Sequence, residues 1–559
     1  MHVQPGLRKG HLLKKFILGI HPVIQHFIEK LRITEIIGDH VQSDKRRKID
    51  TENVLCLLIH NCLTSPSPLY EIQDWVKPLD VRNLGISSDE VEFIYDERVA
   101  RALDNLYSSR HAEVFFQLAL RAIKIFELDC SQMHNDTTTV TFSGKYAHWN
   151  ARETLAYGHN KDHRPDLKQL VLGLTVTADG AVPLLHKIYD GNKTDDQTHI
   201  ANHKRLQKLL SCTDFIYVAD SKLASEINLK KIDQWGGRFI SVMPRTWKED
   251  GQFKKTVIDG AVKWKPLLSR PNSREPNSKV DCYELAEGKH LTHQGYRLCW
   301  IRSSQKTEQD FDTRMRKNEQ ALDDLRLLQT KLNKYALKTE AQIELKIKSI
   351  LKEHGCKQLI HYAIHEHREY KDIYKKRGRP GASTKAKQAC NILYSISFSP
   401  NVQAIEEASK TDGLFPLITN LDAEKYQPKE ILEIYKFQPF LEKRYSQIKT
   451  YQNIAPVYLK DGKRSVAFLH MQVMALMVAS LIERTLRLAM ERKGIKTLRI
   501  YPEGRECKSP TMFDLVRLFR DVERYEITQS GEVAIYPAKL EVAQKEVLKL
   551  LGIPLSSYQ

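Results

Sequence analysis

The spacing of apolar residues changes along the 559-residue chain. Over residues 12–126, apolar residues recur every three to four positions, as in VIQHFIEKLRITEII, NVLCLLIHNCL and RVARALDNLY. This period predicts helices, because a strand could not place these residues on one face. We therefore expect a helical N-terminal domain over residues 1–127, interrupted near Pro66 and Pro68.

Residues 132–243 change to a pattern of alternating strands and helices. DTTTVTF is a β-branched run, and QLVLGLTVTADGAVPLLHKIYDG predicts two strands joined by a turn. HIANHKRLQKLL and KLASEINLKKIDQW predict helices, whereas DFIYVAD and RFISVMP predict strands. The order of three strands, helix, strand, helix, strand is that of an RNase H-like fold, in which the first and fourth strands are adjacent. The predicted fold class is α/β, with an RNase H-like core over residues 128–245 and 425–490.

Residues 246–424 are predicted to interrupt this core as an insertion. They begin with a polar, turn-rich stretch over residues 267–279, followed by the strand-like YRLCWIRSS. An apolar stripe then predicts a helical hairpin or a short coiled coil, and ILYSISF and LFPLI predict further strands of a small sheet beside the core. The stripe comprises Leu322, Leu325, Leu328, Leu332 and Tyr335.

The last part of the chain contains its longest apolar segment. VAFLHMQVMALMVASLIERTLRLAM predicts a helix buried against the catalytic sheet. The uninterrupted apolar run at residues 474–481 is too short to cross a bilayer, so we expect a cytoplasmic protein without membrane association. Residues 491–559 predict a strand and a helix to which no role is assigned.

Charge indicates a candidate partner. Lys and Arg number 87 against 69 Asp and Glu, which gives a formal net charge of +18 at pH 7. Such an excess favours a polyanionic partner through counterion release, and nucleic acid is the commonest one. A basic cluster in the N-terminal domain could grip DNA phosphates and grooves, although a helical scaffold with a solvated basic loop explains it equally well. The cluster comprises Lys45, Arg46, Arg47 and Lys48.

Three acids form the candidate active site. Asp136 lies in the first predicted strand, Asp220 ends the apolar run FIYVAD, and Glu442 lies in YKFQPFLEKRYSQIK. Carboxylates can hold two Mg²⁺ ions roughly 3.5–4 Å apart, which neutralise the entering and leaving oxygens of a phosphodiester. A structural alternative is that Asp136 caps a turn and that Asp220 caps a helix beginning at Lys222.

The surroundings of Glu442 carry a recognisable spacing. Two residues separate Tyr435 from Gln438, three separate Gln438 from Glu442, and six separate Glu442 from Lys449. With this spacing the chain resembles bacterial insertion-sequence DDE transposases, in the group with a tyrosine-arginine-glutamate-lysine signature around the third acid. Gln438 stands where that group has arginine, and Pro439 is a second departure that places the helix start shortly before Glu442. The resemblance extends over nearly the whole chain, including DHRPDLKQLVLGLTVTADGAVPL and GNKTDD.

The resemblance implies a transposase that binds terminal inverted repeats and catalyses metal-dependent DNA strand cleavage and strand transfer. It also favours DNA binding by the helical N-terminal domain over residues 1–127. Asp136 would bridge two Mg²⁺ ions, with Asp220 on one and Glu442 on the other, and Mn²⁺ would serve as a substitute. Lys449, two α-helical turns after Glu442, and Tyr435 would contact DNA. The implied partners are double-stranded DNA of element ends and target, and a second copy of the chain in a synaptic homodimer. The resemblance also marks neighbours of the site without a catalytic role: His163, Arg164, Asp166, Gln169, Gly191, Asn192 and Asp195.

Two rival functions remain at this point. One is an RNase H-like nuclease that cuts DNA without joining it. The other is a catalytically inert DNA-binding derivative of a transposase. The presence of all three acids argues against the inert derivative.

Other glutamates could supply the third acid. Glu433 precedes the patterned run, and Glu483 and Glu491 lie late in the long apolar helix, where we expect solvated positions. Glu442 alone has Lys449 placed two turns ahead. We therefore expect Glu442 to be required, and Glu433 and Glu483 to be replaceable with little loss.

Two further motifs lie in the predicted insertion. KKRGRPG, with Arg377 and Arg379, has the core of an AT-hook, whose arginines enter the narrow minor groove of A·T-rich DNA; a flexible basic loop is the favoured alternative. The second motif would place two histidines one helical turn apart as zinc ligands, but it lacks a CxxC pair and is disfavoured. Its residues are Cys356, His361, His365 and His367.

Overall fold

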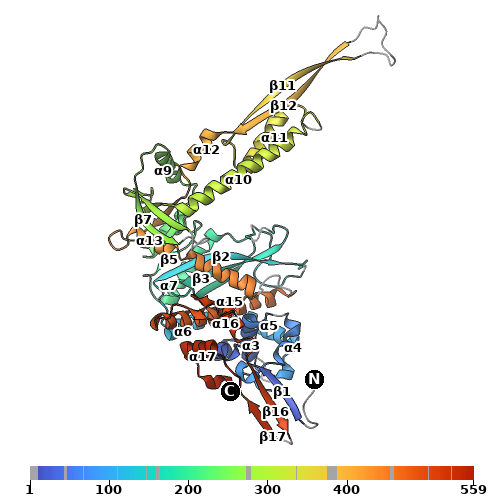
Figure 1. The fold of residues 1–559 in the computed structure, drawn as a ribbon, viewed down its shortest axis with the longest axis vertical. Coiled ribbons are helices and arrows are strands. Elements are labelled where there is room, and N and C mark those ends of the chain that lie inside the picture. The colour runs from blue at the N-terminus through green and yellow to red at the C-terminus, as the bar shows by residue number, and fades with distance from the viewer. Residues whose placement is uncertain are drawn as a thin grey trace. The chain divides into compact units, whose positions relative to one another are not determined.

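The computed structural model divides the chain into two compact units, which Figure 1 draws together. Unit 1 comprises Met1–Ser241, Asn420–Asp422 and Ile431–Gln559; unit 2 comprises Val242–Thr419 and Ala423–Glu430. The structure describes residues 11–42, 47–66, 68–109, 111–146, 148–158, 160–161, 164–271, 279–334, 337–373, 387–452, 459–501, 503–529 and 532–559. Several predicted positions lie outside the described residues, namely Lys45, Arg46, His163, Tyr335, Arg377 and Arg379.

The N-terminal part of unit 1 is largely helical, as its apolar period predicts. In α5, for example, Val99, Leu103 and Leu106 are buried on one face. The helices are α1 (His21–Leu31), α2 (Ile33–His40), α3 (Thr51–Thr64), α4 (Ile72–Val76), α5 (Asp96–Ser108) and α6 (His111–Phe126).

The helical prediction is wrong at the start of this region. Residues His11–Ile17 form strand β1, which pairs antiparallel with β16 (Glu523–Gln529); β16 in turn pairs with β17 (Glu532–Tyr536). The partner of β1 comes from the other end of the chain, so the apolar spacing of HLLKKFI could not reveal the pairing.

The central sheet of unit 1 is mixed and places α/β structure where the sequence predicts it. Its strand order is β4-β3-β2-β5-β6. β2, β3 and β4 run antiparallel, whereas β5 pairs parallel with both β2 and β6. The predicted adjacency of the first and fourth strands is therefore confirmed. The elements are β2 (Gln132–Phe142), β3 (Lys168–Thr177), β4 (Pro183–Tyr189), α7 (His199–Leu210), β5 (Ile216–Val218), α8 (Glu226–Gln234) and β6 (Arg238–Val242).

The long apolar helix is α15 (Gly462–Arg492), which forms the core of unit 1. It contacts β4 as predicted, and it packs more extensively on α3 and α5. The helix is longer than its uninterrupted apolar run suggests, with a mean hydropathy of 1.9 over its most apolar window. Length and hydropathy alone would let it cross a membrane, but 94% of that window is buried inside the protein, as in a core helix.

The C-terminal region continues unit 1 beyond α15. α16 (Met512–Phe519) begins with a capping box between Thr511 and Asp514, and it packs on α15, as does α17 (Val542–Leu551). The predicted helix of this region is confirmed, and the neighbouring strands are short. They are β14 (Leu498–Arg499) and β15 (Glu506–Cys507).

The strands of unit 2 outside the ribbon run antiparallel to one another. The strand order is β13-β10-β8-β7, and β9 pairs with β10. The expectation of turns is wrong for residues 267–271, because they lie in strand β7, and residues 268–271 pair with β8. The strands are β7 (Trp264–Pro271), β8 (Val280–Ala286), β9 (His290–Leu291), β10 (Arg297–Ser303) and β13 (Leu414–Thr419), and two of the helices are α9 (Lys248–Ile258) and α12 (Val402–Ser409). A further helix, α13 (Pro428–Tyr435), begins in unit 2, and its residues from Ile431 on belong to unit 1.

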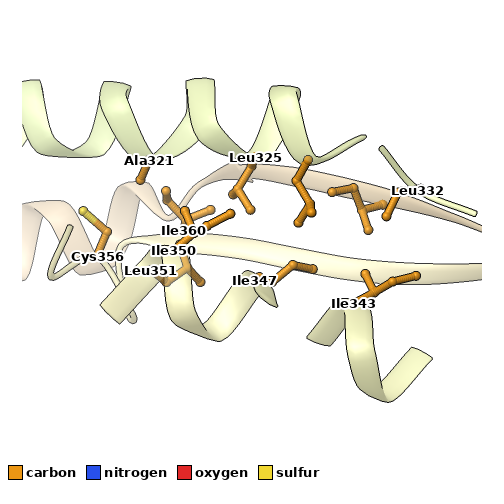
Figure 2. Packing of buried hydrophobic residues seen from close by; sticks show 11 residues of the cluster. Ala321, Leu325, Leu332, Ile343, Ile347, Ile350, Leu351, Cys356 and Ile360 are labelled. Carbon is orange, nitrogen blue, oxygen red and sulfur yellow. The ribbon is translucent and has the colours of Figure 1, made fainter. Parts of the chain in front are cut away.

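The rest of unit 2 is an arm in which a helical hairpin supports a long two-stranded ribbon (Figure 1). The predicted hairpin is confirmed as α10 (Ser304–Gln329) and α11 (Glu340–Glu353). ILYSISF belongs to the ribbon of β11 (Ile360–Ile373) and β12 (Lys387–Pro400), and not to the small sheet as expected. Figure 2 shows the apolar core that joins hairpin and ribbon, with Leu325, Ile347 and Ile360 among its members.

The histidines of the disfavoured zinc motif lie on strand β11, so the prediction that two of them lie one helical turn apart is wrong. His365 Nε2 is 2.8 Å from Ser397 Oγ and His367 Nε2 is 2.7 Å from Ser395 Oγ, both across the ribbon. Cys356 is instead buried in the core cluster between hairpin and ribbon. Residues two apart on a strand share a face, which keeps these exposed histidines away from the buried thiol.

Candidate active site

Strand β2 carries Asp136 in the middle of the unit 1 sheet. Asp136 pairs with Leu174 of β3, and its side chain is 22% exposed. Tyr445 ties the helix of the third acid to this point, because its hydroxyl donates to the Asp136 carbonyl oxygen and accepts from the Leu174 N–H at 3.0 Å. The backbone at Asp136 is therefore held from two elements.

Asp220 lies two residues beyond the carboxyl end of β5. Its Oδ1 accepts a hydrogen bond from the Lys222 N–H at 3.0 Å, and its carbonyl oxygen accepts from Ser241 Oγ at 2.6 Å. The alternative that Asp220 caps a helix is wrong, because α8 begins at Glu226 with Ser225 as its N-cap. Asp220 instead closes a turn with one carboxylate oxygen.

Helix α14 (Gln438–Ser446) carries Glu442. Pro439 lies in its first turn, so the predicted late start of the helix is confirmed. Gln438 anchors this turn to β2, because its Oε1 is 3.1 Å from His134 Nδ1 and its Nε2 donates to the Asn135 carbonyl oxygen at 3.4 Å. Gln438 thus joins α14 to the residues just before Asp136.

The α-helical register does not continue to Lys449. Gln447–Tyr451 form a π-helical turn directly after α14. A π-helix closes its hydrogen bonds over five residues, so the two-turn alignment expected between Glu442 and Lys449 does not apply.

Asp136 lies close enough to both Asp220 and Glu442 for its charge to act on each of them. Burial raises the pKa of Asp136. Burial and then the Asp136 charge raise the pKa of Asp220 to about 6, and the same two causes raise the pKa of Glu442. Tyr435 lies beside them, since its pKa is raised first by burial and then by the charges of all three acids. Elements far apart in sequence therefore bring the predicted acids and Tyr435 together.

Two further charged residues complete this cluster. Asp195 Oδ1 accepts from Thr137 Oγ1 at 2.5 Å, and its charge adds to the raised pKa of Asp136 and Asp220. The resemblance marks Asp195 as a neighbour of the site, and the structure agrees. Lys161, whose Nζ is 3.3 Å from Asp136 Oδ1, was missed by sequence reasoning. It follows a polar loop without periodicity, so no local signal singles it out.

The other marked neighbours shape the loop around the site. Gln169 is buried, and its Nε2 donates to the Gly191 carbonyl oxygen at 2.7 Å. A Cβ at Gly191 would lie 1.9 Å from the Gln169 carbonyl oxygen, so only glycine fits there. Arg164 and Asp166 form an exposed ion pair at 2.8 Å, which contributes little to stability.

Glu483 is buried, and the expectation of a solvated position is wrong. Its side chain is 1% exposed and lies 2.6 Å from Arg444, and it also accepts from Gln447 Nε2 and the Met512 N–H. Burial opposes ionisation of Glu483, but Arg444 and Arg487 outweigh it, so the pKa is lowered. Apolar periodicity cannot disclose this ion pair, because Arg444 comes from a different helix.

The donor set fits a hard divalent cation in its chemistry. Among the residues that the structure describes, no group of three or more His, Cys, Asp or Glu side chains is arranged to hold a metal ion as it stands. Asp136, Asp220 and Glu442 nevertheless offer only oxygen donors, which Mg²⁺ prefers. Their raised pKa values reflect burial and mutual repulsion that a cation would relieve.

A basic cleft of about 640 Å³ lies in the N-terminal part of unit 1. Arg47 and Lys48, the described half of the predicted basic cluster, line it together with Arg98 and Arg101. Part of this charge is compensated, since Arg47 lies 2.9 Å from Asp50.

Comparison with known proteins yields one family match and distant structural likenesses. Residues 14–120 match a family described as a domain of unknown function (DUF4277), and no curated protein matches the chain. The chain is similar to the piggyBac transposase in a synaptic complex with hairpin DNA, at 8% identity, with 90% of this chain and 82% of that chain covered and a TM-score of 0.37. It is also similar to the Mos1 transposase in a paired-end complex with the left transposon end. The identity is 9%, 37% of this chain and 62% of that chain are covered, and the TM-score is 0.15. These identities and TM-scores are low, so the site's own residues carry the functional proposal.

Proposed function

We propose that the protein is a metal-dependent phosphoryl-transfer enzyme acting on DNA, and specifically the DDE transposase of an insertion sequence. Its core would be RNase H-like, with unit 2 as the insertion between the second and third acids. The observation that carries this proposal is the convergence of Asp136, Asp220 and Glu442 from β2, the end of β5 and α14. The Asp136 charge acts on both Asp220 and Glu442, although these elements are distant in sequence.

The roles of the residues follow from the chemistry of phosphodiester cleavage. Asp136, Asp220 and Glu442 would hold Mg²⁺, or Mn²⁺ in its place. The bound ions supply charge neutralisation at the attacking and leaving oxygens. Tyr445 and Gln438 hold α14 against β2 and so keep Glu442 beside Asp136. Tyr435, next to all three acids, is placed to contact a DNA phosphate.

DNA is the partner that the charge of the chain favours. The formal net charge is +18, and the basic cleft lined by Arg47, Lys48, Arg98 and Arg101 offers a surface for phosphates of the element ends. Coordinated cutting of two ends calls for two active sites, so the active species would be a homodimer on DNA in the cytoplasm.

The deciding experiment separates joining from cutting. Purified protein is incubated with Mg²⁺, a labelled pre-cut element end that carries a free 3′-hydroxyl, and a supercoiled plasmid. A transposase joins the end to the plasmid, and the joined product is absent with Asp136→Asn. Cleavage of uncut ends without any joining would indicate the RNase H-like nuclease, and binding without cleavage would indicate an inert derivative.

A further inference from the structure

Lys161 places a positive charge directly against the acids of the candidate site. Its Nζ lies 3.3 Å from Asp136 Oδ1 and also donates to the Thr137 carbonyl oxygen. Its backbone N–H donates to Thr139 Oγ1 at 3.2 Å, which fixes the base of the side chain beside β2. The Lys161 side chain is 42% exposed, so its ammonium group can leave the carboxylate for solvent.

The ammonium group acts on the whole acidic cluster. The Lys161 charge opposes the raised pKa of Asp136, Asp220 and Glu442 alike. Asp195 adds a fourth carboxylate through its bond to Thr137. Several acids thus share one neighbouring ammonium group, and its single charge offsets only part of their repulsion.

We propose that Lys161 is a built-in counter-ion that competes with a divalent cation for the Asp136 carboxylate and is displaced when the cation binds. The inference rests on the proposed function, because it takes the three acids as the metal ligands. A divalent cation carries twice the charge of an ammonium group, so it wins the carboxylates once it is present. The displaced Lys161 stays beside the site on a flexible four-carbon stem, where a DNA phosphate is a suitable new partner.

The test is a calorimetric titration of the metal-stripped full-length protein with Mn²⁺ at pH 8, without DNA. Lys161→Gln removes the competing charge and is expected to bind Mn²⁺ about two- to fivefold more tightly than wild type, the range that an exposed ion pair gives. Lys161→Met repeats the test with a long apolar stem, and Lys161→Arg keeps the charge and should match wild type. Lys168→Gln is the matched control, since Lys168 lies at the far end of β3, 6.0 Å from the Tyr157 ring. It should also match wild type.

A second readout does not depend on calorimetry. The melting temperature without metal should be lower for Lys161→Gln than for wild type, and the rise on adding Mn²⁺ should be larger. Equal or weaker Mn²⁺ binding by both Lys161→Gln and Lys161→Met overturns the inference. Asp136→Asn distinguishes a failure of the Lys161 inference from a failure of the proposed metal site. If this variant leaves Mn²⁺ binding unchanged, the ion does not bind at the acids, and the proposed metal site itself is wrong.

Discussion

Two helices of unit 1, α14 and α15, carry glutamates that differ in exposure, in partners and in the direction of the pKa shift. On α14, Glu442 is exposed, and within the described residues its carboxylate makes no hydrogen bond or ion pair. In the last third of α15, Glu483 is buried against Arg444 at 2.6 Å. Partial desolvation by the surrounding protein and the Asp136 charge raise the pKa of the exposed Glu442, whereas Arg444 and Arg487 lower the pKa of Glu483.

Under the proposed function, the difference separates an acid that binds metal, Glu442, from one that stabilises the fold, Glu483. Arg444 joins Glu483 to α14, and its Nε and Nη2 also donate to the Ala181 and Gly180 carbonyl oxygens in the turn between β3 and β4. Glu483 therefore stabilises the helix that presents Glu442. The carboxylates of the site repel one another in the metal-free protein, so they lower its stability and leave their charge for a ligand.

Replacing Glu483 should give the largest loss of stability. Glu483→Gln removes one partner of a buried ion pair and leaves Arg444 uncompensated, which typically costs about 3 kcal/mol or more. Urea denaturation of the metal-free protein measures the change. Glu491→Gln, at an exposed position on the same helix, is the control and should change stability by less than about 0.5 kcal/mol. Equal stabilities of the two variants would show that the buried pair contributes nothing.

Replacing Asp220 should raise the stability of the metal-free protein, by less than replacing Glu483 lowers it. Burial and the neighbouring acids raise the pKa of Asp220 to about 6 from 3.8, so its ionised form destabilises the fold above pH 6. Asp220→Asn keeps an oxygen acceptor for the Lys222 N–H and should stabilise the metal-free protein by about 1–2 kcal/mol at pH 8. The gain should shrink as pH falls through 6 and vanish near pH 4, where the wild-type carboxyl is protonated. A variant less stable than wild type at pH 8 would contradict the repulsion.

Replacing Gln438, which joins α14 to β2, should give the smallest change in stability of the three. Gln438→Ala deletes the contacts with His134 and the Asn135 carbonyl oxygen, which together should cost about 1 kcal/mol. Looser placement of Glu442 should also slow strand cleavage by about tenfold. Gln438→Glu keeps the acceptor for His134 but sets a carboxylate oxygen against the Asn135 carbonyl oxygen, so it should not restore the lost stability. An unchanged cleavage rate in Gln438→Ala would show that this contact does not position the acid.

Local patterns predicted the elements that carry the site. The β-branched run of β2, the apolar run of β5 and the order of strands and helices placed Asp136 and Asp220 on adjacent strands, which β2 and β5 are. The spacing around Glu442, with Pro439 near the helix start, placed the third acid on α14. These features depend on residues close in sequence or on the order of segments.

Features that depend on distant partners could not be predicted in this way. β1 forms a strand because β16 pairs with it, and Glu483 is buried because Arg444 reaches it from another helix. Lys161 acquires its importance only from the fold, which brings it beside Asp136. Neither apolar period nor spacing carries such information, since each of these residues looks ordinary among its sequence neighbours.

The most direct test of the account is Mg²⁺-dependent cleavage of a labelled element end by Glu442→Gln and Glu433→Gln, measured together with their melting temperatures. Both positions are exposed and lie near each other in sequence, so both variants should fold and bind ends as wild type does. Glu442→Gln should lose cleavage by roughly a thousandfold or more, as expected when a ligand of the catalytic ions is removed, and Glu433→Gln should cleave at nearly the wild-type rate. A folded Glu442→Gln protein that still cuts, beside an inactive Glu433→Gln protein, would contradict the assignment of the third acid.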